Sequence, residues 1–231
     1  MPIYDKYKII FIHIPKCGGS SINEMLGIKD IFDMNRLKGW IYEQVKKGDL
    51  QIMYGNTIRK NHYYELDHAL FKHIFKNHKV KCKEYFKFAV VRNPYERLLS
   101  EFFYNNDRFI QKKGDTPADF TEFLMELQTR WGEINKLDHF KYSHFYPQYF
   151  FTNTLDVNKK GCAMDYVCKL EEIDELCGVL KEKTGFNFQL KKENVNSKKS
   201  KINKEEYLTP ENKEIIYRLY KKDFAQFGYA K

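Results

Sequence analysis

A lysine and two glycines follow an apolar run near the start of the chain. The run, Lys8–Ile14 (KIIFIHI), predicts a buried strand, and Pro15 stops it. The glycines that come next predict a tight turn, and the serines after them predict the cap of a helix running to about Leu26. The first N–H groups of a helix have no partner within it, so this turn is typical of an anion site. We expect the phosphate-binding residues to be Lys16, Cys17, Gly18, Gly19, Ser20 and Ser21.

Three better-known phosphate motifs do not fit this turn. The P-loop of nucleotide triphosphatases has its lysine after the last glycine, whereas Lys16 precedes both glycines. The GxGxxG pattern of dinucleotide-binding proteins is absent. A cysteine phosphatase has an arginine soon after its thiol, but Asn23 occupies that place. Cys17 also has no evident partner for nucleophilic chemistry, so we interpret it as structural.

A second run of the same kind, Lys87–Val91 (KFAVV), predicts another buried strand. Arg92 follows it directly, at the end of the strand where ligands of parallel sheets bind, and a guanidinium suits a phosphate. Asn93 and Pro94 predict the start of a helix, with Glu96 in the place of a capping-box carboxylate. Ser100 lies further along that helix. We expect Arg97 on a solvated face or in an ion pair.

The rest of the chain alternates in the same way. Residues 162–170 predict a third strand, and apolar positions from 173 to 180 predict a helix after it. Thr209 and Pro210 open a last helix, which closes near Gly228. This pattern predicts an α/β fold, with a central, largely parallel sheet flanked by helices, in a single domain over residues 1–231.

Composition narrows the class of protein. The chain has 231 residues, a net charge of +9 and 42% apolar residues, which is too apolar for a disordered chain. No run approaches the ~20 apolar residues of a membrane helix, and the start has no secretory signal. We therefore expect a cytoplasmic protein, or one of the Golgi lumen if the chain is part of a longer protein. The five cysteines have neither a disulfide pattern nor zinc spacing.

The excess positive charge is concentrated in one segment. Residues 191–204 hold six lysines and one glutamate. The basic balance of the chain favours an anionic partner, which could be an anionic glycan, a phosphorylated cofactor or nucleic acid, unless it reflects nothing specific. No nucleic-acid recognition motif accompanies it.

Taken together, the two strand–turn–helix segments resemble the sulfotransferases that use 3′-phosphoadenosine-5′-phosphosulfate, especially the carbohydrate branch. The family pattern HIPKxGGTS is similar to His13–Ser20, and VRNPxxRLxSxYxx is similar to Val91–Tyr104. Residues 144–148, 166–171 and 223–229 resemble later family motifs in the same order, so the resemblance spans nearly the whole chain.

The resemblance implies a role for each motif. The first would hold the 5′-phosphosulfate, and Arg92 with Ser100 would hold the 3′-phosphate. The family also has a late loop that folds over the nucleotide, which is similar to Asn196, Ser197, Lys198 and Lys199. That loop remains open between a lid and an ordinary solvated loop. A metal ion is not expected, because Lys16 and the helix N-terminus can stabilise the leaving phosphate.

The base that takes the proton of the acceptor is the least determined residue. Heparan-type 2-O-sulfotransferases have a base histidine at the start of a helix upstream of the 3′-phosphate arginine. That resemblance implies His68 as the catalytic base beside Lys16, with His62 and Glu65 as alternatives. A surface histidine that caps a helix is the ordinary explanation of His68.

We therefore expect a sulfotransferase that moves a sulfuryl group from 3′-phosphoadenosine-5′-phosphosulfate to a hydroxyl, most simply of a glycan. Its acceptor contacts would come from residues 39–60 and 105–137, where Trp40, Tyr42 and Trp131 either stack on sugars or pack in the core. The alternatives are a nucleotide kinase with an atypical P-loop, a sulfotransferase-like fold without catalysis, and a module that binds polyanions or nucleic acid. The sequence leaves the oligomeric state open.

Overall fold

The computed structural model describes residues 3–27, 68, 70–104, 110, 113–136, 140–153, 162–190 and 202–231. A sheet of four strands crosses its centre in the order β1 (Ile3–Tyr4), β2 (Ile9–Ile12), β3 (Phe86–Val91) and β4 (Tyr166–Lys169). Strands β2, β3 and β4 are parallel, and the short β1 is antiparallel to β2. The predicted α/β fold with a largely parallel sheet is confirmed.

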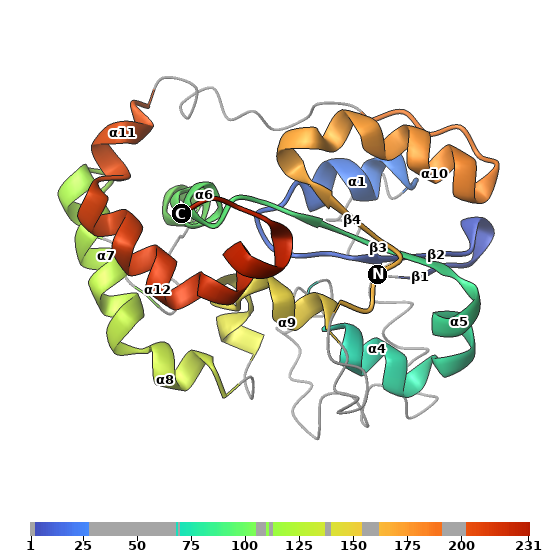
Figure 1. Ribbon diagram of the computed structural model, residues 1–231, viewed down its shortest axis with the longest axis horizontal. Helices are drawn as coiled ribbons and strands as arrows, with labels where there is room; N and C mark the ends of the chain where they lie inside the picture. Colours follow the sequence, from blue (N-terminus) through green and yellow to red (C-terminus); the bar gives the residue numbers. More distant parts are fainter. Residues whose placement is uncertain are drawn as a thin grey trace.

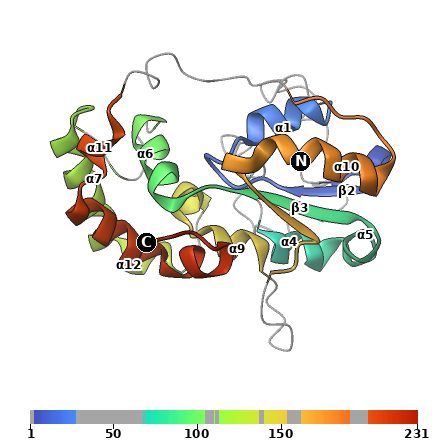
Figure 2. The ribbon, with the colours of Figure 1, turned by 45° about the horizontal axis from the view of Figure 1, so that its top comes forward.

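Helices cover both faces of this sheet, as Figures 1 and 2 show. Helices α1 (Gly19–Met25) and α10 (Leu176–Thr184) lie on one face, and α4 (Phe71–Asn77) and α5 (Lys79–Glu84) lie on the other. The remaining helices gather beyond the carboxyl ends of the strands or beneath them (Figure 1): α6 (Pro94–Tyr104), α7 (Pro117–Thr129), α8 (Trp131–Ile134), α9 (Gln148–Thr152), α11 (Lys204–Tyr207) and α12 (Pro210–Phe227). Short 3₁₀ turns are η1 (Asp5–Tyr7), η3 (Phe140–Phe145) and η4 (Leu170–Glu175).

Strand β2 and the last four residues of β3 are buried because they are apolar and mostly β-branched or aromatic, whereas β1 and most of β4 are only partly buried. Every residue of β2 is at most 1% exposed, and so are the last four of β3. Helix α12 packs on α6, α7 and α9 and continues the core beyond the sheet. Trp131 packs edge-on against Tyr220, with ring centroids 5.0 Å apart, so it serves the core. No helix within the described ranges is long and apolar enough to cross a membrane.

Two predicted element boundaries were wrong. The strand expected over residues 162–170 is only Tyr166–Lys169, because Cys162 instead makes an isolated antiparallel bridge with Asn153. The serines expected to cap α1 lie inside the helix, which begins one residue earlier at Gly19. Gly18 is the cap residue, with a left-handed φ of 77°, and no side chain accepts a bond there. Glycine adopts this conformation without the strain that serine would suffer.

The predicted ends of two other helices were correct. Asn93 caps α6 with its side-chain oxygen, which accepts from Tyr95 N at 2.9 Å. Thr209 caps α12, Pro210 is its first residue, and Gly228 ends it with a φ of 66°. Helix α6 is thereby fixed directly after β3, which sets the direction in which Arg92 leaves the sheet.

Candidate functional site

The loop between β2 and α1 has an unusual backbone conformation at Lys16 and no space for a side chain at Gly19. Lys16 has a φ of 65°, one of two left-handed non-glycine residues in the described chain, which costs about 1 kcal/mol. A Cβ on Gly19 would lie only 1.8 Å from His13 Nε2, so the backbone passes directly over that imidazole. Strained backbone of this kind is concentrated at functional sites and favours such a role here.

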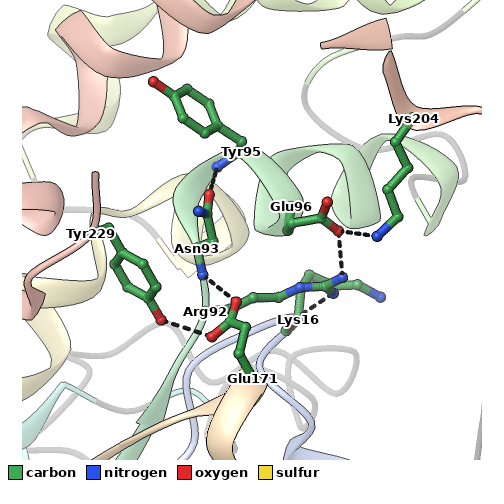
Figure 3. A network of polar contacts seen from close by, with 8 residues as sticks. All are labelled: Lys16, Arg92, Asn93, Tyr95, Glu96, Glu171, Lys204 and Tyr229. Atoms are coloured by element: carbon green, nitrogen blue, oxygen red, sulfur yellow. Dashed lines mark hydrogen bonds and ion pairs between the residues drawn. The ribbon is translucent and has the colours of Figure 1, made fainter. Parts of the chain in front are cut away.

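Arg92 lies beside this loop at the neighbouring strand end. Its Nη1 donates to the Lys16 carbonyl oxygen at 3.4 Å, and its Nη2 lies 3.3 Å from Glu96 Oε2 (Figure 3). Ser100 follows Glu96 by four residues on α6, so the two side chains share one face of the helix. The structure thus brings together the two halves of the predicted phosphate site, which are 76 residues apart.

Glu96 does not have the role predicted for it. The N–H of Asn93, which a capping-box carboxylate would accept, donates instead to Glu171 Oε1 at 2.9 Å. Glu96 pairs with Arg92 and also with Lys204 Nζ, at 2.7 Å (Figure 3). The i, i+4 spacing of Arg92 and Glu96 could have signalled their pair, but no local pattern points to Lys204.

The C-terminus adds a further contact to the same edge of the sheet. Tyr229 donates from its hydroxyl to Glu171 Oε2 at 3.1 Å, and the Lys169 ammonium lies 5.2 Å from the centre of its ring. Burial raises the pKa of the Tyr229 hydroxyl, which therefore stays a donor. Glu171 thus joins the start of α6 to the last residues of the chain.

Arg97 corrects the sequence prediction most clearly, because it is neither solvated nor paired with an acid. Its side chain is 1% exposed, and it donates at 3.0 Å to three main-chain carbonyls, those of Pro15, His144 and Tyr146. Arg97 therefore joins the loop between β2 and α1 to the segment before α9.

Cys17 is buried in a second network beneath the loop. Its Sγ lies 3.3 Å from Gln148 Oε1, and Gln148 bonds both the N–H and the carbonyl of Arg92, each at 2.8 Å. Burial raises the pKa of the Cys17 thiol to about 12, so the side chain is not a nucleophile. Asp223 accepts from Gln148 N and Tyr149 N, at 2.8 and 2.9 Å, and caps α9. This network holds the strand end that carries Arg92.

A cluster of imidazoles borders the loop on its other side. His68 Nδ1 lies 3.1 Å from the His13 carbonyl oxygen, and the His68 ring meets the rings of His13 and His144 edge to face. The Lys16 ammonium lies 3.6 Å from the centre of the Tyr104 ring, which stacks on His144. The predicted base thus lies near the predicted phosphate loop. The rings of His144 and Tyr104 form a chain of contacts from His68 to the Lys16 ammonium.

Several predicted residues lie outside the described part of the chain. These are His62, Glu65, Trp40, Tyr42 and the late-loop residues Asn196, Ser197, Lys198 and Lys199. Within the described ranges, no three histidine, cysteine, aspartate or glutamate side chains are arranged to hold a metal ion. The lid and the metal-free mechanism remain predictions.

Comparison with known proteins identifies the family. The model of the Sulfotransferase family matches residues 2–230, nearly the whole chain. No curated protein and no solved structure gives a significant match. The family match covers both strand–loop–helix segments that meet at Arg92 and Lys16, and the chain therefore belongs to the sulfotransferase family.

Proposed function

We propose that this sulfotransferase takes its sulfuryl group from 3′-phosphoadenosine-5′-phosphosulfate and transfers it to a hydroxyl of a glycan. One observation carries the proposal: the Arg92 guanidinium bonds the Lys16 carbonyl, so cationic residues from two adjacent strand ends meet at one loop. The donor has two phosphate groups that such a pair can hold separately. The net charge of +9 favours an anionic glycan as acceptor.

The arrangement around Arg92 fits a phosphate. Its guanidinium already holds a carboxylate, that of Glu96, and both side chains are about a quarter exposed. A phosphate can therefore reach Arg92 from solvent and compete with Glu96 for it. Ser100, on the face of α6 that bears Glu96, would add a hydroxyl donor to the same group.

When bound, the donor supplies a sulfuryl group joined to a phosphate that leaves with additional negative charge. The Lys16 ammonium stabilises that charge, and its resting place on the exposed Tyr104 ring keeps it beside the loop. The Lys16 contribution increases as the bond breaks, so it acts mainly on turnover.

The contact of His68 Nδ1 favours the tautomer that a general base needs. Its Nδ1 lies 3.1 Å from the His13 carbonyl oxygen, which can only accept, so in neutral His68 we expect the proton on Nδ1 and the lone pair on Nε2. His68 Nε2 would take the proton of the acceptor hydroxyl as the hydroxyl oxygen attacks sulfur.

Calorimetry and thermal denaturation with 3′-phosphoadenosine-5′-phosphate test the donor assignment. Saturating nucleotide should stabilise the fold by about 2.7 kcal/mol at a hundred times its Kd. ATP should stabilise it less, because it has no 3′-phosphate for Arg92. Equal stabilisation by ATP would favour a nucleotide kinase.

Substitutions then separate the roles of the residues. Arg92→Ala should weaken nucleotide binding roughly ten- to a hundred-fold, while the exposed Arg218→Ala should leave it unchanged. Lys16→Ala should lower kcat more than affinity. Unchanged nucleotide affinity in Arg92→Ala would refute the phosphate assignment.

Transfer itself is measured with ³⁵S-labelled donor and a panel of desulfated heparan, chondroitin and dermatan chains. His68→Ala should lower kcat at least roughly a hundred-fold with nucleotide affinity within about two-fold. Labelling of none of these polymers, with labelling of a small hydroxyl compound, would contradict the glycan acceptor.

A further inference from the structure

A buried carboxylate and an imidazole form a pair directly behind the proposed base. His144 Nδ1 lies 2.8 Å from Glu101 Oε2, which joins η3 to α6 across 43 residues of sequence. The Glu101 side chain is 1% exposed and the His144 side chain is 9% exposed. The imidazole is therefore the member of the pair that can contact other groups of the site.

Holding the His144 imidazole with the buried Glu101 carboxylate costs more free energy than holding it with a neutral group. Burial of an ionised carboxylate is unfavourable unless its oxygens are bonded, and Glu101 Oε1 has no hydrogen-bond partner among the described residues. A glutamine of the same shape could accept the same bond without a charge. What only glutamate supplies at this position is its negative charge.

The pair is connected to both sides of the candidate site. The His144 ring meets the His68 ring at 88°, with centroids 5.1 Å apart. It also stacks on the Tyr104 ring, with centroids 5.8 Å apart and planes 7° apart, and that ring carries the Lys16 ammonium. His144 thus contacts the proposed base on one side and the residue that holds Lys16 on the other.

We propose that Glu101 and His144 are positioning residues of the sulfuryl transfer that stabilise the positive charge growing on His68. This inference rests on the proposed function, with His68 as base. In the transfer, the O–H bond of the acceptor breaks and its proton forms an N–H bond at His68 Nε2. The oxygen electron pair forms the new O–S bond, while the S–O bond to the nucleotide phosphate breaks and leaves its electron pair on that phosphate.

The stabilisation is electrostatic. The His68 imidazolium lies against the His144 ring, and the Glu101 carboxylate lies directly beyond it. Because the Glu101 and His144 side chains are largely withdrawn from water, the carboxylate acts on the new charge with little screening.

The sharpest test is Glu101→Gln, which keeps the hydrogen bond to His144 and removes only the charge. We expect kcat for the labelled polymer to fall about ten- to a hundred-fold, with KM and nucleotide Kd within two-fold. The control is Glu214→Gln on α12, whose carboxylate forms an exposed pair with Arg218 Nε at 2.9 Å, and it should leave kcat unchanged.

A second variant and a spectroscopic measurement keep the test decisive if Glu101→Gln is unstable. In His144→Asn, the side-chain amide can still donate to Glu101, but the ring beside His68 is lost, so kcat should fall to a similar extent. In ¹H–¹⁵N spectra of the wild type, the His144 Nδ1 proton should be strongly deshielded by the carboxylate, and Glu101→Gln should shift it upfield.

The outcomes separate the inference from the proposed function. If folded Glu101→Gln and His144→Asn keep wild-type kcat while His68→Ala loses it, the pair is purely structural and the inference is refuted. If the wild type binds no 3′-phosphorylated nucleotide, or His68→Ala keeps its turnover, the proposed function or its base is wrong instead.

Discussion

The substitution Arg97→Met should destabilise the protein more than the loss of any exposed ion pair in the chain. Methionine fills most of the space of the arginine stem but donates no hydrogen bonds. The carbonyls of Pro15, His144 and Tyr146 would each lose a donor at 3.0 Å in a site that is 1% exposed.

The size of the effect can be estimated from these three bonds. Each lost hydrogen bond costs about 1–1.5 kcal/mol, so the total is roughly 3–5 kcal/mol. The low value for each bond allows for the guanidinium no longer being buried. The total is a large part of the roughly 5–15 kcal/mol by which domains are stable. For a chain of this length it lowers Tm by roughly 6–20 °C.

Thermal and urea denaturation of the two proteins provide the measurement. The control is Arg218→Met, because Arg218 forms an exposed i, i+4 pair with Glu214 and its loss should cost at most about 0.5 kcal/mol. Nucleotide affinity should also fall in Arg97→Met, since Pro15 belongs to the phosphate loop. A loss of stability below about 1 kcal/mol would refute the argument that Arg97 holds the loop.

Three further outcomes follow from the same networks. Glu96→Gln should tighten the binding of 3′-phosphoadenosine-5′-phosphate up to about five-fold in calorimetry. The reason is that the partly exposed ion pair, which competes with the nucleotide for Arg92, contributes about 1 kcal/mol or less. Weaker binding would show that Glu96 orients Arg92 instead. Burial raises the pKa of Asp223 to about 6 from its ordinary 3.8, so its contribution to stability is greatest below about pH 4 and is lost as pH rises through 6. Denaturation at several pH values should show a flatter dependence in Asp223→Asn over that interval, and an unchanged dependence would contradict the shift. Iodoacetamide at pH 8 should modify the exposed Cys162 and spare Cys17 in the native protein, because burial raises the Cys17 pKa to about 12. Mass spectrometry measures the labelling of each cysteine. Rapid labelling of Cys17 would show that the loop opens.

The two central strands and the glycine turn after the first of them could be predicted from the sequence because their signals are local. Apart from Lys8, His13 and Lys87, the runs KIIFIHI and KFAVV are apolar and mostly β-branched or aromatic, which by itself predicts burial. The positions of Lys16 and Arg92 follow, since each comes directly after a buried strand and parallel strands end at one edge of a sheet.

The tertiary structure decided what each charged side chain does at that edge. Arg92 and Arg97 are five residues apart in one segment, yet one contacts the partly exposed Glu96 and the other is enclosed by three carbonyls from distant segments. Composition and spacing do not distinguish them, because burial depends on which chain segments pack against each face of α6.

The same reason applies to the long-range contacts that the sequence missed. Glu171 caps α6 from 78 residues away, Lys204 reaches Glu96 across 108 residues, and Glu101 holds His144 across 43. A pair of this kind forms only when the fold has brought its members together, and it leaves no period or motif in the chain. The sequence by itself therefore determined the strand ends that carry the site, whereas their partners depend on the packing of α6, η3 and the C-terminal residues around them.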